Sequence, residues 1–126
     1  MPILTILIED SKTIRDALIP TMAEMANVQV IAVADTAADA IDALEAHKAA
    51  WQLAVVDLFL REGHGLTVMR ACRDRRPDQH VVALTNYATE DIRRSCAEAG
   101  ADAIFDKSTE LEAFFEYLRE LWASPE

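Results

Sequence analysis

Residues 53–59 read LAVVDLF, in which four apolar residues precede one carboxylate and two more apolar residues follow it. The apolar run has the length and composition of a strand that is buried on both faces, as in a parallel sheet. Burial of an unpaired carboxylate costs far more free energy than one hydrogen bond returns. Two interpretations of Asp57 are therefore open: either the chain turns there and the carboxylate reaches solvent, or a cation lies beside it.

Similar apolar runs recur along the chain and alternate with helical patterns. We expect strands over residues 3–8, 28–33, 52–56, 81–84 and 103–105. The segments after them have the apolar spacing of helices, over residues 11–26, 66–75 and 89–99 and in the segments that begin near residues 36 and 109. Five alternations of strand and helix predict a doubly wound α/β domain with a parallel sheet.

Several residues mark the ends and faces of these helices. Thr36 and Thr109 begin capping-box patterns, and Gly100 is expected to end the helix over residues 89–99. Pro20 lies inside the first helical pattern, so we expect it to kink or shorten that helix. The last helix carries one broad apolar stripe that is expected to face the core, formed by Leu111, Phe114, Phe115, Leu118, Leu121 and Trp122.

Composition and charge limit the class of protein. The chain has 126 residues, of which 52% are hydrophobic and 27% charged, as expected for one soluble domain over residues 1–123 with a loose tail at 124–126 and no output domain. A formal net charge of −10 disfavours nucleic acid and anionic membrane surfaces as partners. The chain has no transmembrane-length apolar stretch and no signal-peptide pattern, which predicts a cytoplasmic location. Cys72 and Cys96 lack metal-type spacing and are expected to be buried.

Polar residues follow four of the five predicted strands. Glu9 and Asp10 follow the first strand, Asp57 the third and Lys107 the fifth, and Thr85 ends the fourth. Each has an ordinary structural reading when taken alone, such as a helix cap or a solvated surface charge. Because ligands of doubly wound folds bind outside the carboxyl ends of the strands, the joint arrangement favours a functional site.

The chemistry of these side chains suits phosphoryl transfer. Three carboxylates held close together repel one another, and a hard divalent cation such as Mg²⁺, which prefers oxygen ligands, compensates them. The ammonium group of Lys107 adds a second positive charge. A carboxylate in such a site can act as the nucleophile and form an acyl phosphate, while the other groups position the reactants and neutralise charge.

These residues, in this order and spacing, resemble the receiver domain of the two-component response-regulator family over essentially the whole chain. The matching motifs are the acidic pair Glu9-Asp10, Asp57 after its apolar strand, VALT at residues 82–85, and GADAIFDK at residues 100–107. The resemblance implies a five-stranded sheet in the order 2-1-3-4-5, as in flavodoxin-like folds. It also implies a stand-alone receiver similar to those of chemotaxis.

The resemblance further implies a role for each residue of the acidic group. Asp57 accepts the phosphoryl group from the phosphohistidine of a histidine kinase or of a histidine phosphotransfer protein. Asp10, Asp57 and the backbone carbonyl of Phe59 are the implied Mg²⁺ ligands, and Glu9 acts on the ion through water. The chain is then a phosphoacceptor that loses its phosphoryl group slowly, and it is not a turnover enzyme.

Two further residues have implied roles in catalysis and signalling. Lys107 pairs with Asp57 and then with the phosphoryl group, and the Thr85 hydroxyl bonds a phosphoryl oxygen. The signal is expected to leave by protein contact through the fourth helix, the fifth strand and the fifth helix, a surface that could also form a homodimer. Nucleic acid and membrane are not expected partners, and the sequence identifies neither the kinase nor the target.

The chain departs from the family pattern at positions around the site. Ile104 stands where the family often has an aromatic switch residue, and Phe105 beside it points to the opposite face of a strand. Ser108 replaces a proline after the lysine, Arg61 replaces a proline four residues after the phosphorylated aspartate, and Asn86 stands where a smaller residue is frequent. None of these departures removes a group that phosphorylation needs.

Two bulky residues are expected to modulate the lifetime of the acyl phosphate. Phe59 lies two residues after Asp57, and Tyr87 lies two residues after Thr85. Attacking water must approach in line with the departing aspartate oxygen. We therefore expect an apolar cover over that path to slow hydrolysis.

Other classes of protein fit the sequence less well. A phosphatase of the haloacid type needs a second aspartate where this chain has Phe59. A nucleotide-binding protein needs a glycine-rich loop after the first strand, and residues 63–65, GHG, lie elsewhere and lack the third glycine. The alternatives that stay open are a receiver-like interaction module that works without phosphorylation, a phosphotransfer shuttle and a phosphate sink.

Overall fold

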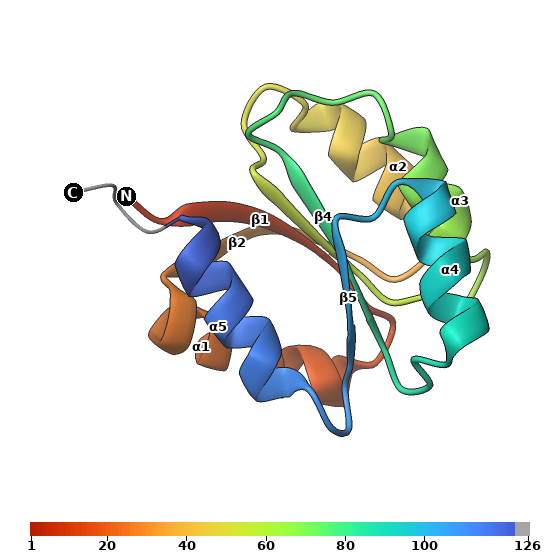
Figure 1. The fold of residues 1–126 in the computed structure, drawn as a ribbon. Helices are drawn as coiled ribbons and strands as arrows, with labels where there is room; N and C mark the ends of the chain where they lie inside the picture. Colours follow the sequence, from red (N-terminus) through yellow and green to blue (C-terminus); the bar gives the residue numbers. More distant parts are fainter. Residues whose placement is uncertain (123–126) are drawn as a thin grey trace.

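The computed structural model describes residues 1–122, so the expected tail at residues 124–126 lies outside the described residues (Figure 1). Strands and helices alternate along the chain. The strands are β1 (Ile3–Ile8), β2 (Val28–Ala34), β3 (Leu53–Val56), β4 (His80–Thr85) and β5 (Ala103–Asp106). The helices are α1 (Lys12–Ala26), α2 (Ala37–Ala46), α3 (Gly65–Ala71), α4 (Glu90–Ala99) and α5 (Leu111–Leu121).

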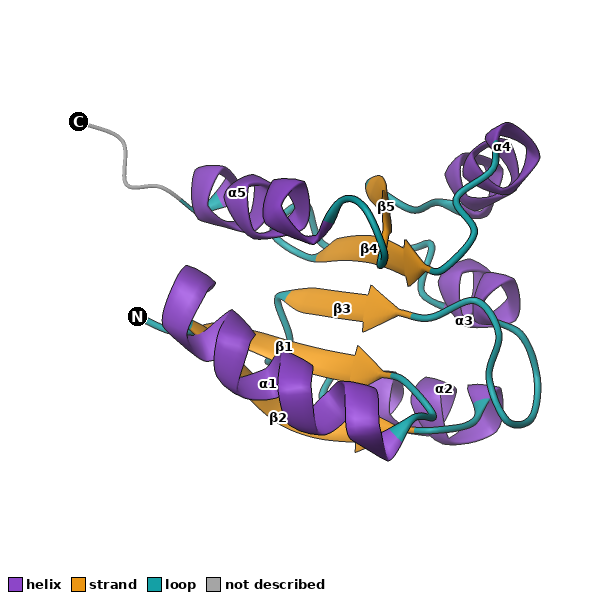
Figure 2. Cartoon of the chain, turned by 90° about the horizontal axis from the view of Figure 1, so that it is seen from below, coloured by secondary structure: helices purple, strands orange, loops and turns teal. Residues whose placement is uncertain are grey.

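The strands form one parallel sheet in the order β2-β1-β3-β4-β5, which confirms the predicted order. Helices α1 and α5 cover one face of the sheet, and α2, α3 and α4 cover the other (Figures 1 and 2). Because every strand points the same way, all five carboxyl ends lie at one edge of the sheet. The topology therefore brings together residues that are far apart in the sequence.

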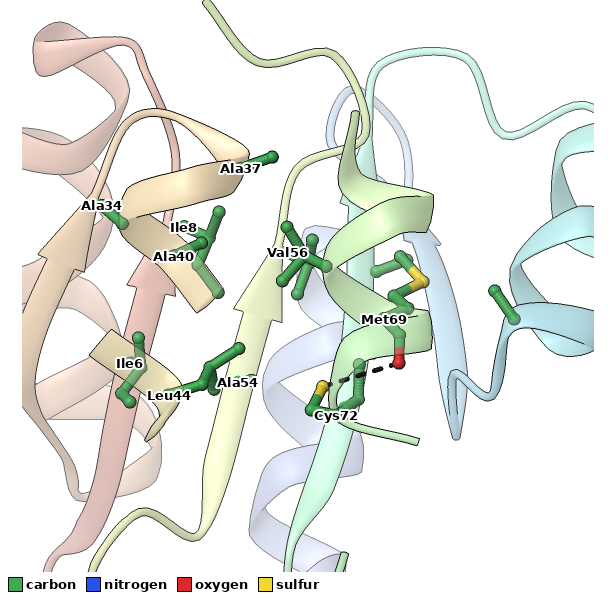
Figure 3. Packing of buried hydrophobic residues seen from close by; sticks show 14 of the residues in the cluster. Ile6, Ile8, Ala34, Ala37, Ala40, Leu44, Ala54, Val56, Met69 and Cys72 are labelled. Carbon is green, nitrogen blue, oxygen red and sulfur yellow. Dashed lines mark hydrogen bonds between the residues drawn. The ribbon is translucent and has the colours of Figure 1, made fainter. Parts of the chain in front are cut away.

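The stretch LAVV at residues 53–56 forms β3, and each of its four residues is buried. Leu53 and Val55 belong to the core under α1 and α5, whereas Ala54 and Val56 belong to the core under α2, α3 and α4. Figure 3 shows this second core, with Val56 between the side chains of β1 and α3. Burial on both faces explains why β3 is continuously apolar, since each buried aliphatic side chain contributes about 1.5–3 kcal/mol.

Most predicted helix signals are confirmed. The hydroxyls of Ser11, Thr36 and Thr89 accept hydrogen bonds from the first turns of α1, α2 and α4. Gly100 ends α4 with φ of 104°, a left-handed conformation that glycine adopts without strain. Part of the predicted apolar stripe faces the core under α1 and α5: its buried members are Phe114, Phe115 and Leu118, and its partly buried members are Leu111 and Trp122.

Three local predictions are wrong. The expected shortening of α1 at Pro20 does not occur, because the helix runs on to Ala26, whereas a kink at Pro20 stays a prediction. Pro20 lies on the exposed side of the helix, where solvent can reach the carbonyl group that it leaves without a donor. Helix α3 ends at Ala71, not near Arg75, and beyond this end the Arg75 guanidinium donates to the carbonyl groups of Cys72 and Gln79.

The third error concerns the start of α5. Thr109 does not begin a capping box, because the N-cap of α5 is Glu110 and no side chain caps the helix there. The Glu110 carboxylate instead accepts hydrogen bonds from Arg93 and from the Asp106 amide.

Two predictions from composition can be compared with the structure. Cys72 and Cys96 are buried free thiols, as expected, and both lie in the core under α2, α3 and α4. Within residues 1–122, no helix has both the length and the apolar character needed to cross a membrane.

Candidate functional site

The parallel register places Glu9 and Asp57 side by side at the carboxyl edge of the sheet. Ile8, the last residue of β1, is paired with Val56, the last residue of β3. The pairing continues past both strands, since the Asp57 amide donates to the Ile8 carbonyl at 2.9 Å and the Glu9 amide donates to the Ala34 carbonyl at 3.0 Å. The backbone therefore fixes both carboxylates before any side-chain contact is considered.

Helix α3 begins against the backbone of Asp57, and Gly65 makes this approach possible. The Gly65 amide donates to the Leu58 carbonyl at 2.8 Å. A Cβ atom at position 65 would lie 2.4 Å from the Asp57 carbonyl oxygen and 2.8 Å from the Leu58 Cα. His64 caps α3 by accepting a hydrogen bond from the Leu66 amide at its Nδ1. The sequence reasoning did not identify this packing requirement.

The three predicted acidic residues come together with Lys107. Carboxylate oxygens of Glu9, Asp10 and Asp57 all lie within 4.8 Å of one another. The Lys107 Nζ lies 2.5 Å from Glu9 Oε1 and 3.2 Å from Asp57 Oδ2. Glu9 and Asp57 are buried, at 2% and 8% exposure. The expected pairing of Lys107 with Asp57 is present, but the contact of Lys107 with Glu9 is shorter.

Lys107 does not neutralise the three carboxylates of the site to the same extent. Burial raises the pKa of Asp57 to about 6, against the opposing charge of Lys107 and with Glu9 adding to the rise. Burial and the neighbouring Glu9 also raise the pKa of Asp10. Burial alone would raise the pKa of Glu9, but hydrogen bonds from Lys107 and the Ser11 amide hold it below its ordinary value. Asp10 and Asp57 thus lack a full counter-charge, and a hard divalent cation with oxygen ligands fits these two carboxylates.

Thr85 is the last residue of β4 and has no exposed surface. Its hydroxyl is the only buried side-chain polar atom without a hydrogen-bond partner among residues 1–122. The Lys107 amide donates to the Thr85 carbonyl at 2.8 Å, so the backbones of the two predicted site residues are joined. A buried polar group without a partner carries a free-energy cost and calls for an explanation. A ligand oxygen that accepts from this hydroxyl would remove the cost.

The three predicted modulating residues on loops are exposed. Phe59 is 54% exposed and its ring lies edge-on to His64, with centroids 5.4 Å apart. Tyr87 is 71% exposed on the loop that follows β4. Asn86 is also exposed, and together with Lys107 it lines a groove of about 410 Å³ between α1 and α5.

Ile104 and Phe105 lie on opposite faces of β5, as the alternation of side chains along a strand predicts. Ile104 is half-buried and packs against the core under α2, α3 and α4. Phe105 lies on the opposite face, where its ring contacts Phe114 and Tyr117 with centroids 5.7 and 5.5 Å away. Phe105 therefore belongs to the core under α1 and α5, and it does not stand in for the aromatic residue that is missing at position 104.

Sequence reasoning missed several charged residues around the site. Arg15 donates from Nη1 to the Glu9 carbonyl at 2.8 Å. Arg93, Asp106 and Glu110 form a hydrogen-bonded network between α4, β5 and the start of α5. In a chain with 27% charged residues, such side chains read as solvated surface groups, and no spacing rule pairs residues this far apart. The local signal in this part of the sequence, the capping-box pattern from Thr109 to Glu112, indicated a helix cap and not this network.

Asp57→Asn is expected to raise the free energy of unfolding of the metal-free protein at pH 7 by about 1–2 kcal/mol. The folded-state pKa of Asp57 is raised, to about 6, so its contribution to stability is complete below pH 3.8 and is lost as pH rises toward 6. The gain from the amide should therefore be small near pH 4 and constant above pH 6, as measured by urea unfolding in EDTA. Asp42→Asn, on the exposed side of α2, is the control. A gain that is equal at pH 4 and pH 7 would contradict this account.

Comparisons with known proteins identify the family of this chain. The sequence profile of the response regulator receiver domain matches residues 5–119. The photosynthetic apparatus regulatory protein RegA of Rhodobacter capsulatus is 39% identical over 54 residues, which cover 43% of this chain and 29% of that protein. This chain thus matches less than a third of the length of that curated relative.

Solved structures agree on the fold. The response regulator domain of CheB from Thermotoga maritima superposes with a TM-score of 0.82 at 14% identity, covering 99% of this chain and 100% of that one. The receiver domain of a sensor histidine kinase from Pseudomonas aeruginosa PAO1, solved with a magnesium ion in its active-site cleft, has a TM-score of 0.77 at 19% identity and covers 98% and 100% of the two chains. With the profile match over most of its length, the chain belongs to the response regulator receiver domain family.

Proposed function

We propose that this receiver domain accepts a phosphoryl group on Asp57 in a Mg²⁺-dependent reaction and signals through contacts that depend on phosphorylation. The observation that carries the proposal is the buried cluster in which Asp57 lies 3.2 Å from Lys107 and within 4.8 Å of the carboxylates of Glu9 and Asp10. The Thr85 hydroxyl, which is buried and has no hydrogen-bond partner within the described part of the chain, supports the proposal as a donor for a phosphoryl oxygen. Receiver domains in general are phosphoacceptors and are not turnover enzymes.

In the proposed reaction, a carboxylate oxygen of Asp57 attacks the phosphorus of a phosphohistidine. The new P–O bond forms as the P–N bond breaks, and the electron pair of that bond stays with the departing imidazole, which takes up a proton. Lys107 loosens from Asp57 and pairs with the phosphoryl oxygens, and Thr85 donates its hydroxyl to one of them. These two residues supply positive charge and a hydrogen bond where negative charge is spread in the transition state.

The donor set of the site fits magnesium. Asp10, Asp57 and the backbone carbonyl of Phe59 would hold the ion, and bound magnesium would neutralise charge on the transferring phosphoryl group. Both oxygens of Glu9 are already engaged, Oε1 by Lys107 and Oε2 by the Ser11 amide at 3.1 Å. This engagement supports a role for Glu9 through water and not as a direct ligand.

The expected partners follow from this chemistry. A histidine kinase or a histidine phosphotransfer protein would supply the phosphoryl group, and an unidentified protein would read the phosphorylated state. We propose that this reader, or a second copy of the chain, binds the face formed by α4, β5 and α5. A net charge of −10 supports a protein partner over nucleic acid.

Acetyl phosphate, a small phosphoryl donor, tests the proposed function without a cognate kinase. With Mg²⁺, the intact mass of the protein should rise by one phosphoryl group, and with EDTA it should not. Asp10→Ala should lose most of the adduct, whereas Asp16→Ala, which removes an exposed carboxylate on α1, should keep it. Equal labelling of the wild-type protein in Mg²⁺ and in EDTA would contradict the assignment of a metal-dependent site.

Phe59→Asn is expected to shorten the lifetime of the acyl phosphate by up to about tenfold, which corresponds to about 1.4 kcal/mol of barrier. Phe59 offers bulk and no hydrogen bond beside Asp57, whereas an amide can orient the attacking water. The measurement is the loss of the phosphoryl mass after the donor is removed, with folding checked by circular dichroism. Tyr87→Ala tests the second exposed ring in the same way. If neither variant loses its phosphoryl group faster than the wild type, these rings do not shield the site.

A further inference from the structure

One peptide unit in the loop after Thr85 is held from both sides by polar side chains. The Ala88 amide donates to Asp106 Oδ2 at 3.2 Å, and the Ala88 carbonyl accepts from Arg93 Nε at 3.0 Å. Asp106 is the last residue of β5, and Arg93 lies in the first turns of α4. The loop from Asn86 to Thr89 is therefore fastened to both the strand and the helix that flank it.

The same groups continue onto α5. Arg93 also donates from Nη1 to the Ile104 carbonyl at 3.3 Å and from Nη2 to Glu110 Oε1 at 2.7 Å. Glu110 Oε1 in turn accepts from the Asp106 amide at 3.0 Å. We name Arg93, Asp106 and Glu110 the Ala88 clamp. It joins the loop after β4 to α4, β5 and the start of α5 by side-chain hydrogen bonds.

The Ala88 clamp is connected to the phosphorylation site through the backbone. Lys107 directly follows Asp106, and its amide donates to the Thr85 carbonyl at 2.8 Å while its Nζ contacts Asp57 and Glu9. Asp106 Oδ1 also accepts from the Ser108 amide at 2.8 Å, so the Asp106 carboxylate holds the residues on both sides of Lys107 in place. A shift of Lys107 or of Thr85 therefore strains the bonds that hold Ala88.

We propose that Arg93 and Asp106 are positioning residues that keep the loop after Thr85 in its unphosphorylated place, and that this clamp opens when Asp57 is phosphorylated. The proposal rests on the proposed function. The Thr85 hydroxyl has no hydrogen-bond partner among the residues that the structure describes, whereas a phosphoryl group on Asp57 would offer an acceptor. Movement of Thr85 toward that acceptor draws the loop with it and pulls Ala88 away from Asp106 and Arg93. Because the clamp binds only one of the two loop positions, it shifts the equilibrium toward that position.

The clamp gives the chain a link from the site to α4 and α5 that needs no aromatic switch residue. Ile104 contributes its carbonyl group to the clamp, and its side chain packs into the core under α2, α3 and α4. The Glu110 carboxylate makes no capping hydrogen bond to α5 and belongs to the clamp instead.

Arg93→Gln and Asp106→Asn test the clamp in two independent ways. Arg94→Gln is the matched control, because Arg94 is exposed and its ion pair among residues 1–122 is with Asp91. In the unphosphorylated protein, amide hydrogen exchange of the peptide that covers residues 86–89 should rise about two- to tenfold in both clamp variants. Phosphorylation of Asp57 by acetyl phosphate should become faster by a similar factor. After phosphorylation, wild-type and variant proteins should show the same exchange in this peptide.

Three results separate the outcomes. Faster exchange and faster phosphorylation in both clamp variants, with Arg94→Gln unchanged, would support the clamp. Phosphorylation of the wild type with an unchanged or lower rate in the variants would overturn the clamp and leave the proposed function standing. No phosphoryl adduct on the folded wild-type protein would overturn both.

Discussion

Lys107→Ala is expected to lower the rate of phosphorylation of Asp57 by at least about 100-fold. The Lys107 ammonium is buried between Glu9 and Asp57, at 2.5 and 3.2 Å, where little water can replace it. Its removal leaves two buried carboxylates without their cation and takes away the positive charge that would stabilise the transferring phosphoryl group. The measurement is the initial rate of adduct formation with acetyl phosphate and saturating Mg²⁺.

Two variants make the Lys107 result specific. Lys12→Ala removes a lysine whose side chain is 79% exposed on α1, and it should react like the wild type. Lys107→Arg keeps the charge but changes the shape of the donor, so it should fall between the wild type and Lys107→Ala. In other enzymes, the loss of one such group costs far more than twofold in rate. A rate of phosphorylation of folded Lys107→Ala within about twofold of the wild type would therefore show that this lysine does not take part in the transfer.

Gly65→Ala is expected to destabilise the protein by about 3 kcal/mol. The added Cβ would lie 2.4 Å from the Asp57 carbonyl oxygen and 2.8 Å from the Leu58 Cα, and neither backbone atom can move without displacing β3 or α3. The better helix propensity of alanine offsets only about 1 kcal/mol of this cost. Since the displaced atom belongs to Asp57, the variant should also be phosphorylated more slowly than the wild type.

The control for Gly65→Ala is Thr67→Ala, which changes an exposed position of the same helix. Urea unfolding of both variants in EDTA gives the two free energies at one pH. Equal stability of Gly65→Ala and the wild type would mean that α3 can move away from Asp57 at little cost. The close approach of helix and nucleophile would then be incidental to the site.

The sheet and the acidic cluster could be predicted from the sequence because both depend on local patterns and one topological rule. Continuous apolar runs such as residues 53–56 are typical of strands that are covered on both faces. Once the strands are parallel, the residues that follow them meet at one edge, which explains why Glu9 and Asp57 are neighbours. The alternation of side chains along a strand also placed Phe105 correctly on the face opposite Ile104.

The predictions that failed, at the start of α5 and the end of α3, concern side chains that have several possible hydrogen-bond partners. The pattern from Thr109 to Glu112 predicted a capping box by local rules, but the N-cap of α5 is Glu110. The Glu110 carboxylate accepts charge-assisted and backbone hydrogen bonds from Arg93 and the Asp106 amide instead. Helix α3 also ends earlier than its apolar spacing predicts, and beyond its end the Arg75 guanidinium donates to the carbonyl groups of Cys72 and Gln79. The periodicity of apolar residues does not predict which distant backbone or side-chain groups a charged side chain will bind.

The most direct test of the central claim is to locate the phosphoryl group chemically. An acyl phosphate is reduced by borohydride to an alcohol, so the phosphorylated residue can be read from the masses of peptide fragments. After reaction with acetyl phosphate and Mg²⁺, the reduced residue should be Asp57, and Asp57→Asn should give no reduced peptide. A reduced residue at Glu9 or Asp10 in the wild-type protein, or an undiminished adduct on Asp57→Asn, would contradict the account.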